Sequence, residues 1–235
     1  MKYILLDTET TGTQDEDRIC QLSFIVKSSE ERLVYDEYCD PQRPLSVDAM
    51  SVNHITPQML EGKPQCTQTK AFQTLNALNT PQNVMIGHNI GFDLVMLEKE
   101  GFKNQMKLID TFRCMRHLRP DLPSHALQKL QYQLKLYESP LMQALDICAH
   151  NALYDVTLLE VLMSYLLGLI EQNKLAKLID LSSKPAEVLR FSFGKHAGQK
   201  IADVAKTDMG YLRWMLTQKI DDADLAYTIK KYANG

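Results

Sequence analysis

Short apolar runs in the first half of the chain predict strands. The run YILLDT, residues 3–8, is almost continuously apolar, which is typical of a strand buried on both faces. ICQLSFIV (19–26) and LVYDEYC (33–39) follow at the spacing of hairpins, so we expect three consecutive strands that pair antiparallel. NVMIGHN (83–89) and MKLIDT (106–111) predict two further strands, each followed by a helical pattern.

Helical patterns alternate with these later strands. GFDLVMLEKEG (91–101) ends in a glycine, SHALQKLQYQL (124–134) begins with Ser124 as the expected N-cap, and residues 151–170 form the longest helical pattern. Three strands followed by alternating helices and strands indicate an α/β fold, with a mixed sheet flanked by helices.

The C-terminal end of the chain predicts a separate small unit. LRFSFGKHAGQKIADV (189–204) has the pattern of a β-hairpin, and Thr207 or Asp208 then caps a helix. We therefore expect a main domain over residues 1–175, a linker over 176–188 and a small β-hairpin/helix module over 189–235.

Composition places the chain among soluble globular proteins, with 45% hydrophobic and 23% charged residues. The net charge of −3 is unevenly distributed, because residues 184–235 carry nine Lys/Arg against six Asp/Glu and the rest is acidic. Five dispersed cysteines without a C-x-x-C pair favour a reduced, intracellular protein. We find no signal peptide and no membrane-spanning run, and expect a cytoplasmic protein without membrane partners.

Two carboxylates stand at the end of the first predicted strand. Side chains at i and i+2 of a strand share one face, so Asp7 and Glu9 should project together. An acid-x-acid spacing is common by chance in a chain with 29 acidic residues, and a solvated strand end is the simpler interpretation of this pair alone.

Two later motifs add acidic residues and a histidine. GHNIGFD (87–93) places Asn89 four residues before Asp93, so we expect both on one face at the start of a helix. HNALYD (150–155) places His150 five residues before Asp155, about 140° around a helix, so we expect His150 on the preceding loop. Each motif alone also has a structural interpretation, as a helix cap or a structural histidine.

Together these residues predict a metal-dependent reaction. Four carboxylates in one pocket would repel each other and raise each other's pKa. Divalent cations remove this conflict, and ligand sets made only of oxygen favour Mg²⁺ or Mn²⁺. Two such ions about 3.5–4 Å apart suit attack on a phosphodiester, with a neutral histidine as general base. The set Asp7, Glu9, Asp93, Asp155 and His150 therefore predicts phosphodiester hydrolysis.

The order of these motifs resembles a known signature. D-x-E, N-x-x-x-D and H-x-A-x-x-D follow one another between Asp7 and Asp155, as in the DnaQ-like (DEDDh) 3′→5′ exonucleases with their RNase H-like fold. MSVNHITPQML (50–60) and especially FGKHAGQKIADVAKTDMGYLRWML (193–216) narrow the resemblance to the exodeoxyribonuclease X family.

The resemblance implies an enzyme that releases 5′-mononucleotides from the 3′ ends of single-stranded and duplex DNA, in DNA repair or end processing. It implies that the four acids hold two Mg²⁺ or Mn²⁺ ions and that His150 is the base. It also implies substrate contacts, made by Thr8, Thr10, His54, His88 and Asn89. An RNA 3′→5′ exonuclease remains an alternative, and a catalytically silent nucleic-acid-binding protein is a second one.

Two further features have open interpretations. The segment 111–125 predicts a solvated helix face and loop, with contact to phosphates as the alternative; its basic residues are Arg113, Arg116, His117 and Arg119. Tyr211 and Trp214 lie at i and i+3, which favours the core of the C-terminal module, with stacking on bases as the alternative. DNA binding by this module is a hypothesis that its positive charge supports.

Overall fold

A five-stranded mixed sheet forms the centre of the main domain. The computed structural model describes residues 1–234, and its strands follow the spatial order β3-β2-β1-β4-β5. β1 pairs antiparallel with β2 and parallel with β4, β2 pairs antiparallel with β3, and β4 pairs parallel with β5. The strands are β1 (Tyr3–Thr10), β2 (Ile19–Lys27), β3 (Arg32–Tyr38), β4 (Val84–Gly87) and β5 (Lys107–Asp110). The predicted α/β class with an RNase H-like mixed sheet is confirmed.

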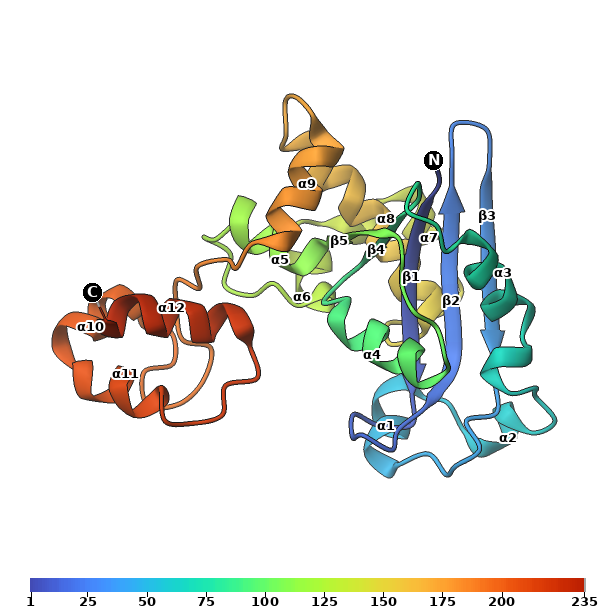
Figure 1. The fold of residues 1–235 in the computed structure, drawn as a ribbon, viewed down its shortest axis with the longest axis horizontal. Coiled ribbons are helices and arrows are strands. Elements are labelled where there is room, and N and C mark those ends of the chain that lie inside the picture. Colours follow the sequence, from blue (N-terminus) through green and yellow to red (C-terminus); the bar gives the residue numbers. More distant parts are fainter. Residues whose placement is uncertain (235) are drawn as a thin grey trace.

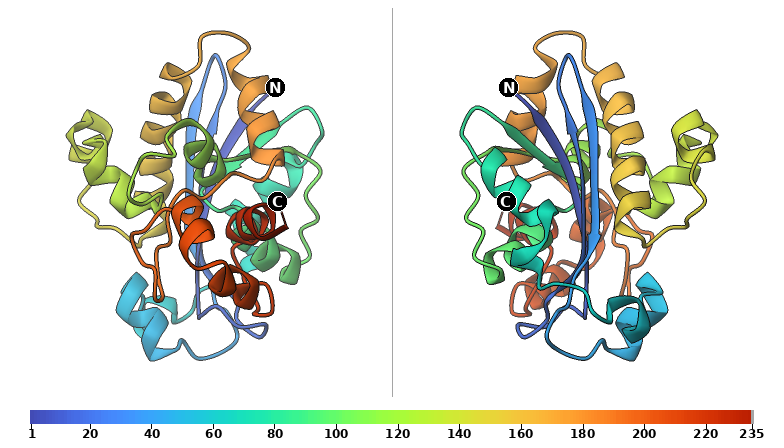
Figure 2. Two further views of the ribbon diagram at one scale, coloured as in Figure 1. Left: turned by 90° about the vertical axis from the view of Figure 1, so that its left-hand side faces the viewer. Right: turned by 90° about the vertical axis from the view of Figure 1, so that its right-hand side faces the viewer.

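Helices cover both faces of this sheet (Figures 1 and 2). They are α1 (Val47–Asn53), α2 (Pro57–Leu60), α3 (Lys70–Leu78), α4 (Gly91–Lys99), α5 (Thr111–Leu118), α6 (Leu127–Gln133), α7 (Pro140–Gln143), α8 (Ala152–Gly168), α9 (Lys174–Ser183), α10 (Ile201–Thr207), α11 (Met209–Met215) and α12 (Ala223–Asn234). None of the helices among residues 1–234 combines the length and apolarity that a membrane span requires.

The alternation of β1 side chains divides the main domain into two hydrophobic cores. Leu5 points into one core, with apolar residues of α5, α8 and α9. Ile4 and Leu6 point into the other core, with residues of α3 and α4. β1 is therefore held on four sides, by two neighbouring strands and by two layers of helices. A strand fixed in this way keeps the side chains at its end in a defined geometry.

Several predicted boundaries differ from the structure. α4 begins at Gly91 as predicted, but Asn89 has a φ of 61° and lies outside this helix, so the expected helix face shared by Asn89 and Asp93 does not exist. α6 begins at Leu127 with Ala126 at the N-cap, so the predicted start at Ser124 is wrong. Residues 176–183 of the expected linker 176–188 belong to α9, which packs against β5 and α5.

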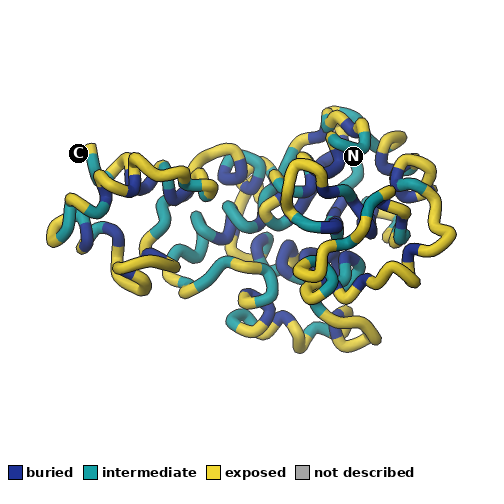
Figure 3. Tube along the Cα trace, turned by 90° about the horizontal axis from the view of Figure 1, so that it is seen from below, coloured by how far each residue is buried: buried dark blue, intermediate teal, exposed yellow. Residues whose placement is uncertain are grey.

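The C-terminal module is almost entirely helical. The predicted hairpin is reduced to a single bridge between Arg190 and Lys200, because the chain turns tightly at Gly194 and Gly198, which both have positive φ. Asp208 caps α11 as expected, since its side chain accepts from the backbone N–H of Tyr211. α10, α11 and α12 enclose a small core of their own, and exposed residues dominate the outer turns of this module (Figure 3).

Ion pairs fix the module to the main domain, from which it protrudes to one side (Figure 1). Arg116 on α5 reaches Asp222 at 2.5 Å and Asp224 at 2.9 Å, and Asp224 is 2% exposed. Arg113 contacts Asp224 at 3.2 Å. The sequence suggested that these arginines belong to a solvated face or to a phosphate site. In the structure, Arg113 and Arg116 belong to neither. They hold the module in place.

Candidate active site

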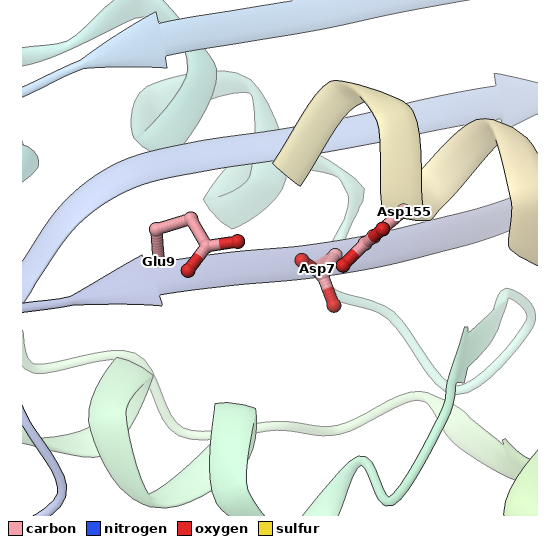
Figure 4. A group of neighbouring side chains, drawn as sticks. All are labelled: Asp7, Glu9 and Asp155. Carbon is pink, nitrogen blue, oxygen red and sulfur yellow. The ribbon is translucent and has the colours of Figure 1, made fainter. Parts of the chain in front are cut away.

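Three carboxylates meet where β1 ends beside the first turns of α8. Asp7 and Glu9 point to the α8 face of the sheet, and Asp155 approaches them from α8 (Figure 4). One ligand atom from each of the three lies within 4.8 Å of the other two. Residues separated by about 150 positions are thus brought to one point, as the motif order predicted.

The fourth acid comes from the opposite face of the sheet. Asp93 lies in the first turn of α4 and is 4% exposed. The Thr8 hydroxyl, which alternation directs away from Asp7 and Glu9, donates to Asp93 Oδ1 at 2.7 Å. Asp93 nevertheless lies near enough to raise the pKa of both Asp7 and Glu9. Thr8 therefore contacts a predicted ligand and does not present its hydroxyl to solvent.

Burial raises the pKa of every acid in the cluster, and repulsion from the other acids raises it further for Asp7 and Glu9. Burial is the main cause throughout, and the charge of Asp155 adds to it for Asp7 and Glu9. The pKa of Glu9 rises to about 8, and those of Asp93 and Asp155 to about 7. Such a site holds its negative charges at neutral pH only when a cation compensates them.

The donor set fits a hard divalent cation. All candidate ligand atoms are carboxylate oxygens, which is the set that Mg²⁺ and Mn²⁺ prefer, and no thiol or imidazole lies within the three-residue cluster. The elevated pKa values and the short distances between oxygens are what an ion would relieve. Asp7, Glu9 and Asp155 are therefore the residues best placed to hold a metal, with Asp93 beside them.

His150 lies on the loop before α8, as predicted. Asn151 is the N-cap of this helix, and its side chain accepts from the Leu153 N–H. His150 has a φ of 62°, an uncommon conformation for a residue with a side chain, and its imidazole is exposed. A backbone hydrogen bond from His150 lowers the pKa of Asp155. Partial burial and the nearby His54 lower the pKa of His150, which keeps its imidazole neutral at physiological pH.

A pocket of about 410 Å³ opens next to Glu9. Thr8 and Thr10 line it from β1, Phe92 lines it from α4, and Val52 and Asn53 line it from α1. The pocket thus combines a polar wall with two apolar side chains. His54 follows this wall directly and is exposed, at the C-cap of α1.

Two predicted substrate residues lie elsewhere. Both ring nitrogens of His88 contact protein atoms, the Thr111 hydroxyl at 2.9 Å and the His125 carbonyl at 2.8 Å. The backbone N–H of Asn89 donates to Asp110 Oδ1 at 2.9 Å, and Asn89 lines a cavity with residues of α12. These contacts give both residues a role in the fold.

Sequence reasoning missed the residues that orient the acids. Gln128 on α6 donates from Nε2 to Asp155 Oδ1 at 2.5 Å. Gln21 is fully buried in β2 and accepts from the Ala152 N–H at 3.2 Å, which fixes the start of α8 next to His150. A glutamine at an inward position of an apolar strand was a usable signal for Gln21. Nothing local to Gln128 indicates its contact with a residue 27 positions away.

Family comparison agrees with the class that this fold and site define. The family described as Exonuclease matches residues 4–161, and the chain belongs to it. The predicted enzyme class, an exonuclease, is thereby confirmed. A second family, described as Exodeoxyribonuclease X-like C-terminal, matches residues 191–219.

Individual relatives match either almost the whole chain or a part of it. Exodeoxyribonuclease 10 of Escherichia coli K12 is 27% identical over 235 aligned residues, covering 97% of each chain. A PolC-type DNA polymerase III of Latilactobacillus sakei is 31% identical over 143 residues, but the match spans only 10% of that protein.

Solved structures confirm the fold. Exonuclease X in complex with 5′ overhanging duplex DNA superimposes with a TM-score of 0.54 at 20% identity, over 77% of this chain and 98% of that one. Escherichia coli exonuclease I with a dA16 oligonucleotide gives a TM-score of 0.55 at 22% identity, over 76% of this chain and 42% of that one.

Proposed function

We propose that this exonuclease is a 3′→5′ exodeoxyribonuclease that depends on Mg²⁺ or Mn²⁺ and acts in DNA end processing or repair. The observation that carries the proposal is the convergence of Asp7, Glu9 and Asp155 within 4.8 Å, with Asp93 and His150 beside them. The names of its relatives support DNA as the substrate, since one is an exodeoxyribonuclease and two structures contain DNA.

The four acids would hold two metal ions. When bound, divalent ions lower the pKa of a coordinated water and neutralise charge on the phosphoryl oxygens. His150, kept neutral by its lowered pKa, accepts the proton of the attacking water. The water oxygen forms a bond to phosphorus while the bond from phosphorus to the 3′ oxygen breaks. The products are a 5′-mononucleotide and a shortened strand with a new 3′-hydroxyl.

The pocket beside Glu9 supports cleavage at the end of a strand. We assign it to the terminal nucleotide, with Phe92 and Val52 against the base and Thr10 bordering the sugar. A pocket of this size beside the catalytic acids accommodates the end of a strand, which is the requirement for an exonuclease.

The test uses matched DNA and RNA oligonucleotides labelled at the 5′ end. We expect a ladder of shortened labelled DNA with Mg²⁺ or Mn²⁺ and no cleavage with a chelator. His150→Ala should lower kcat by about 10²–10⁴-fold while metal binding persists, whereas Asp7→Ala should lose both. His117→Ala, on α5 and outside the acid cluster, is the control.

Each other outcome has a defined meaning. Faster shortening of RNA would replace the DNA assignment by the RNA alternative. Intact strands under every metal condition would identify a silent nucleic-acid-binding protein. Immediate release of one labelled nucleotide would reverse the direction to 5′→3′.

A further inference from the structure

The C-terminal module separates its charges. Residues 189–234 contain eight Lys/Arg and five Asp/Glu. Two of the acids, Asp222 and Asp224, face the main domain, where they pair with Arg116 and Arg113. The remaining surface of the module carries eight basic residues against three acidic ones. Docking therefore leaves the outward surface much more positive than the composition of the module suggests.

Two large aromatic side chains are exposed on this module. Trp214 on α11 is 53% exposed and Phe193, on the loop before α10, is 52% exposed. The sequence favoured a core position for Trp214, and this prediction is wrong. The core is completed by Phe191, Leu212 and Met215 without it. Exposed aromatic residues that the core does not need are typical of binding surfaces.

Tyr211 lies between Trp214 and the loop that carries Phe193. Its ring lies 5.5 Å from that of Trp214 between centroids. A Cβ atom at Gly194 would lie 2.7 Å from the Tyr211 hydroxyl, so the loop that carries Phe193 rests directly on Tyr211. We call Phe193, Tyr211 and Trp214 the aromatic face.

The loop beneath the aromatic face is held firmly. His196 Nε2 lies 2.9 Å from Asp208 Oδ2, and Lys195 Nζ lies 2.8 Å from the same oxygen. The N–H of Gly198 donates to the Phe191 carbonyl at 2.8 Å. Phe193 is therefore presented to solvent by a rigid support, which reduces the conformational entropy lost on binding.

Basic side chains accompany the aromatic face. Arg213 precedes Trp214 on α11, and Lys206 lies at the end of α10, immediately before that helix. Lys195 follows Gly194 in the loop. Within residues 1–234, Arg213 and Lys206 form no salt bridge with an acid. Their charges remain open to an external anion.

We propose that the aromatic face and these basic residues bind single-stranded nucleic acid, with bases stacked on Phe193 and Trp214 and phosphates against Lys206 and Arg213. Flat rings beside unpaired cations match the chemistry of a single strand, because every base has a face for stacking and every linkage carries a charge. α11 and the end of β1 both lie in the lower half of Figure 1. Binding of single-stranded nucleic acid by the module does not depend on the proposed function. Only the statement that the bound nucleic acid is the substrate rests on it.

The test measures strand binding without cleavage. Fluorescence anisotropy of labelled dT30 is recorded with the full chain in a chelator. Phe193→Ser and Trp214→Ser should each weaken binding about tenfold or more, while the melting temperature stays that of the wild type. Tyr227→Ser, which removes a 42% exposed aromatic residue of α12, is the matched control and should bind normally. Arg213→Gln should weaken binding and flatten its salt dependence.

Two results would overturn the proposal. One is unchanged affinity for dT30 in both aromatic variants; the other is an equal loss in Tyr227→Ser. If the Trp214→Ser variant unfolds, the test rests on Phe193→Ser, because the Phe193 side chain lies outside the core of the module. Hydrolysis of a thymidine mononucleotide ester, too short to reach the module, is measured in parallel. A wild type that binds dT30 through this face but cleaves nothing would refute the proposed function and leave this inference standing.

Discussion

Replacing His88 by glutamine tests whether this histidine serves the fold. The bond to the His125 carbonyl requires a proton on Nε2, so Nδ1 of the neutral ring carries no proton. The Thr111 hydroxyl lies 2.9 Å from Nδ1 and 3.0 Å from the Gly87 carbonyl, and these two acceptors share its one proton. Burial lowers the pKa of His88 to about 4, and the positive charges of His125 and Arg116 act in the same direction. The folded protein therefore keeps His88 neutral at a pH where an unfolded chain protonates it.

The magnitude follows from the two pKa values. An unfolded histidine titrates near pH 6.5 and the folded one near pH 4. Between these values only the unfolded chain binds the proton, so the free energy of unfolding falls as the pH falls. Each pH unit corresponds to about 1.4 kcal/mol. Between about pH 7.5 and pH 5, His88 alone should remove about 2 kcal/mol of stability.

Urea unfolding of wild type and His88→Gln at these two pH values, in a chelator, measures this contribution. Glutamine does not titrate, so the loss of stability from about pH 7.5 to pH 5 should be about 2 kcal/mol smaller in the variant. Any constant cost of the substitution cancels in this comparison. Equal losses in both proteins would show that the fold does not hold His88 neutral, and would refute the reasoning.

Three further predictions concern metal, orientation and docking. Mn²⁺ at 100 times its Kd should stabilise the wild type by about 2.7 kcal/mol in thermal unfolding and leave Asp7→Asn unchanged; equal stabilisation would exclude Asp7 as a ligand. Gln128→Leu should weaken Mn²⁺ binding about 10–100-fold by calorimetry, whereas Gln133→Leu on the same helix should not. Arg116→Met should cost about 3 kcal/mol in urea unfolding, because a buried aspartate loses its closest partner. Arg119→Met, whose acidic partner is exposed, should cost below about 1 kcal/mol, and a similar loss in both would contradict the docking role.

The sequence was sufficient to predict the sheet and the acidic cluster. The apolar runs determined which segments became strands, and the two-residue period directed Asp7 and Glu9 to one side of β1. Their partners could be identified because the motifs at Asp93 and Asp155 follow predicted strand and loop ends. Strands and helices have a regular backbone geometry, so the positions of these acids could be predicted from a single sequence.

The features that the sequence did not predict depend on local backbone turns and on contacts between distant segments. Asn89 takes a left-handed conformation that breaks the expected i, i+4 relation to Asp93. The pair formed by Arg116 and Asp222 joins residues 106 positions apart, and no local pattern indicates it. In the C-terminal module, two glycines turn the chain so tightly that apolar alternation does not yield paired strands.

The direction of Thr8 has a consequence for the chain as it folds. Asp7 and Glu9 belong to the side of the sheet covered by α8, whereas Thr8 holds Asp93 from the side covered by α4. The reactive centre is complete only when both layers of helices have closed on β1. If Asp93 is a ligand, as proposed, a nascent or partly unfolded chain with one layer in place would lack a ligand and would not cut a strand. Nuclease activity would then begin only when folding is finished.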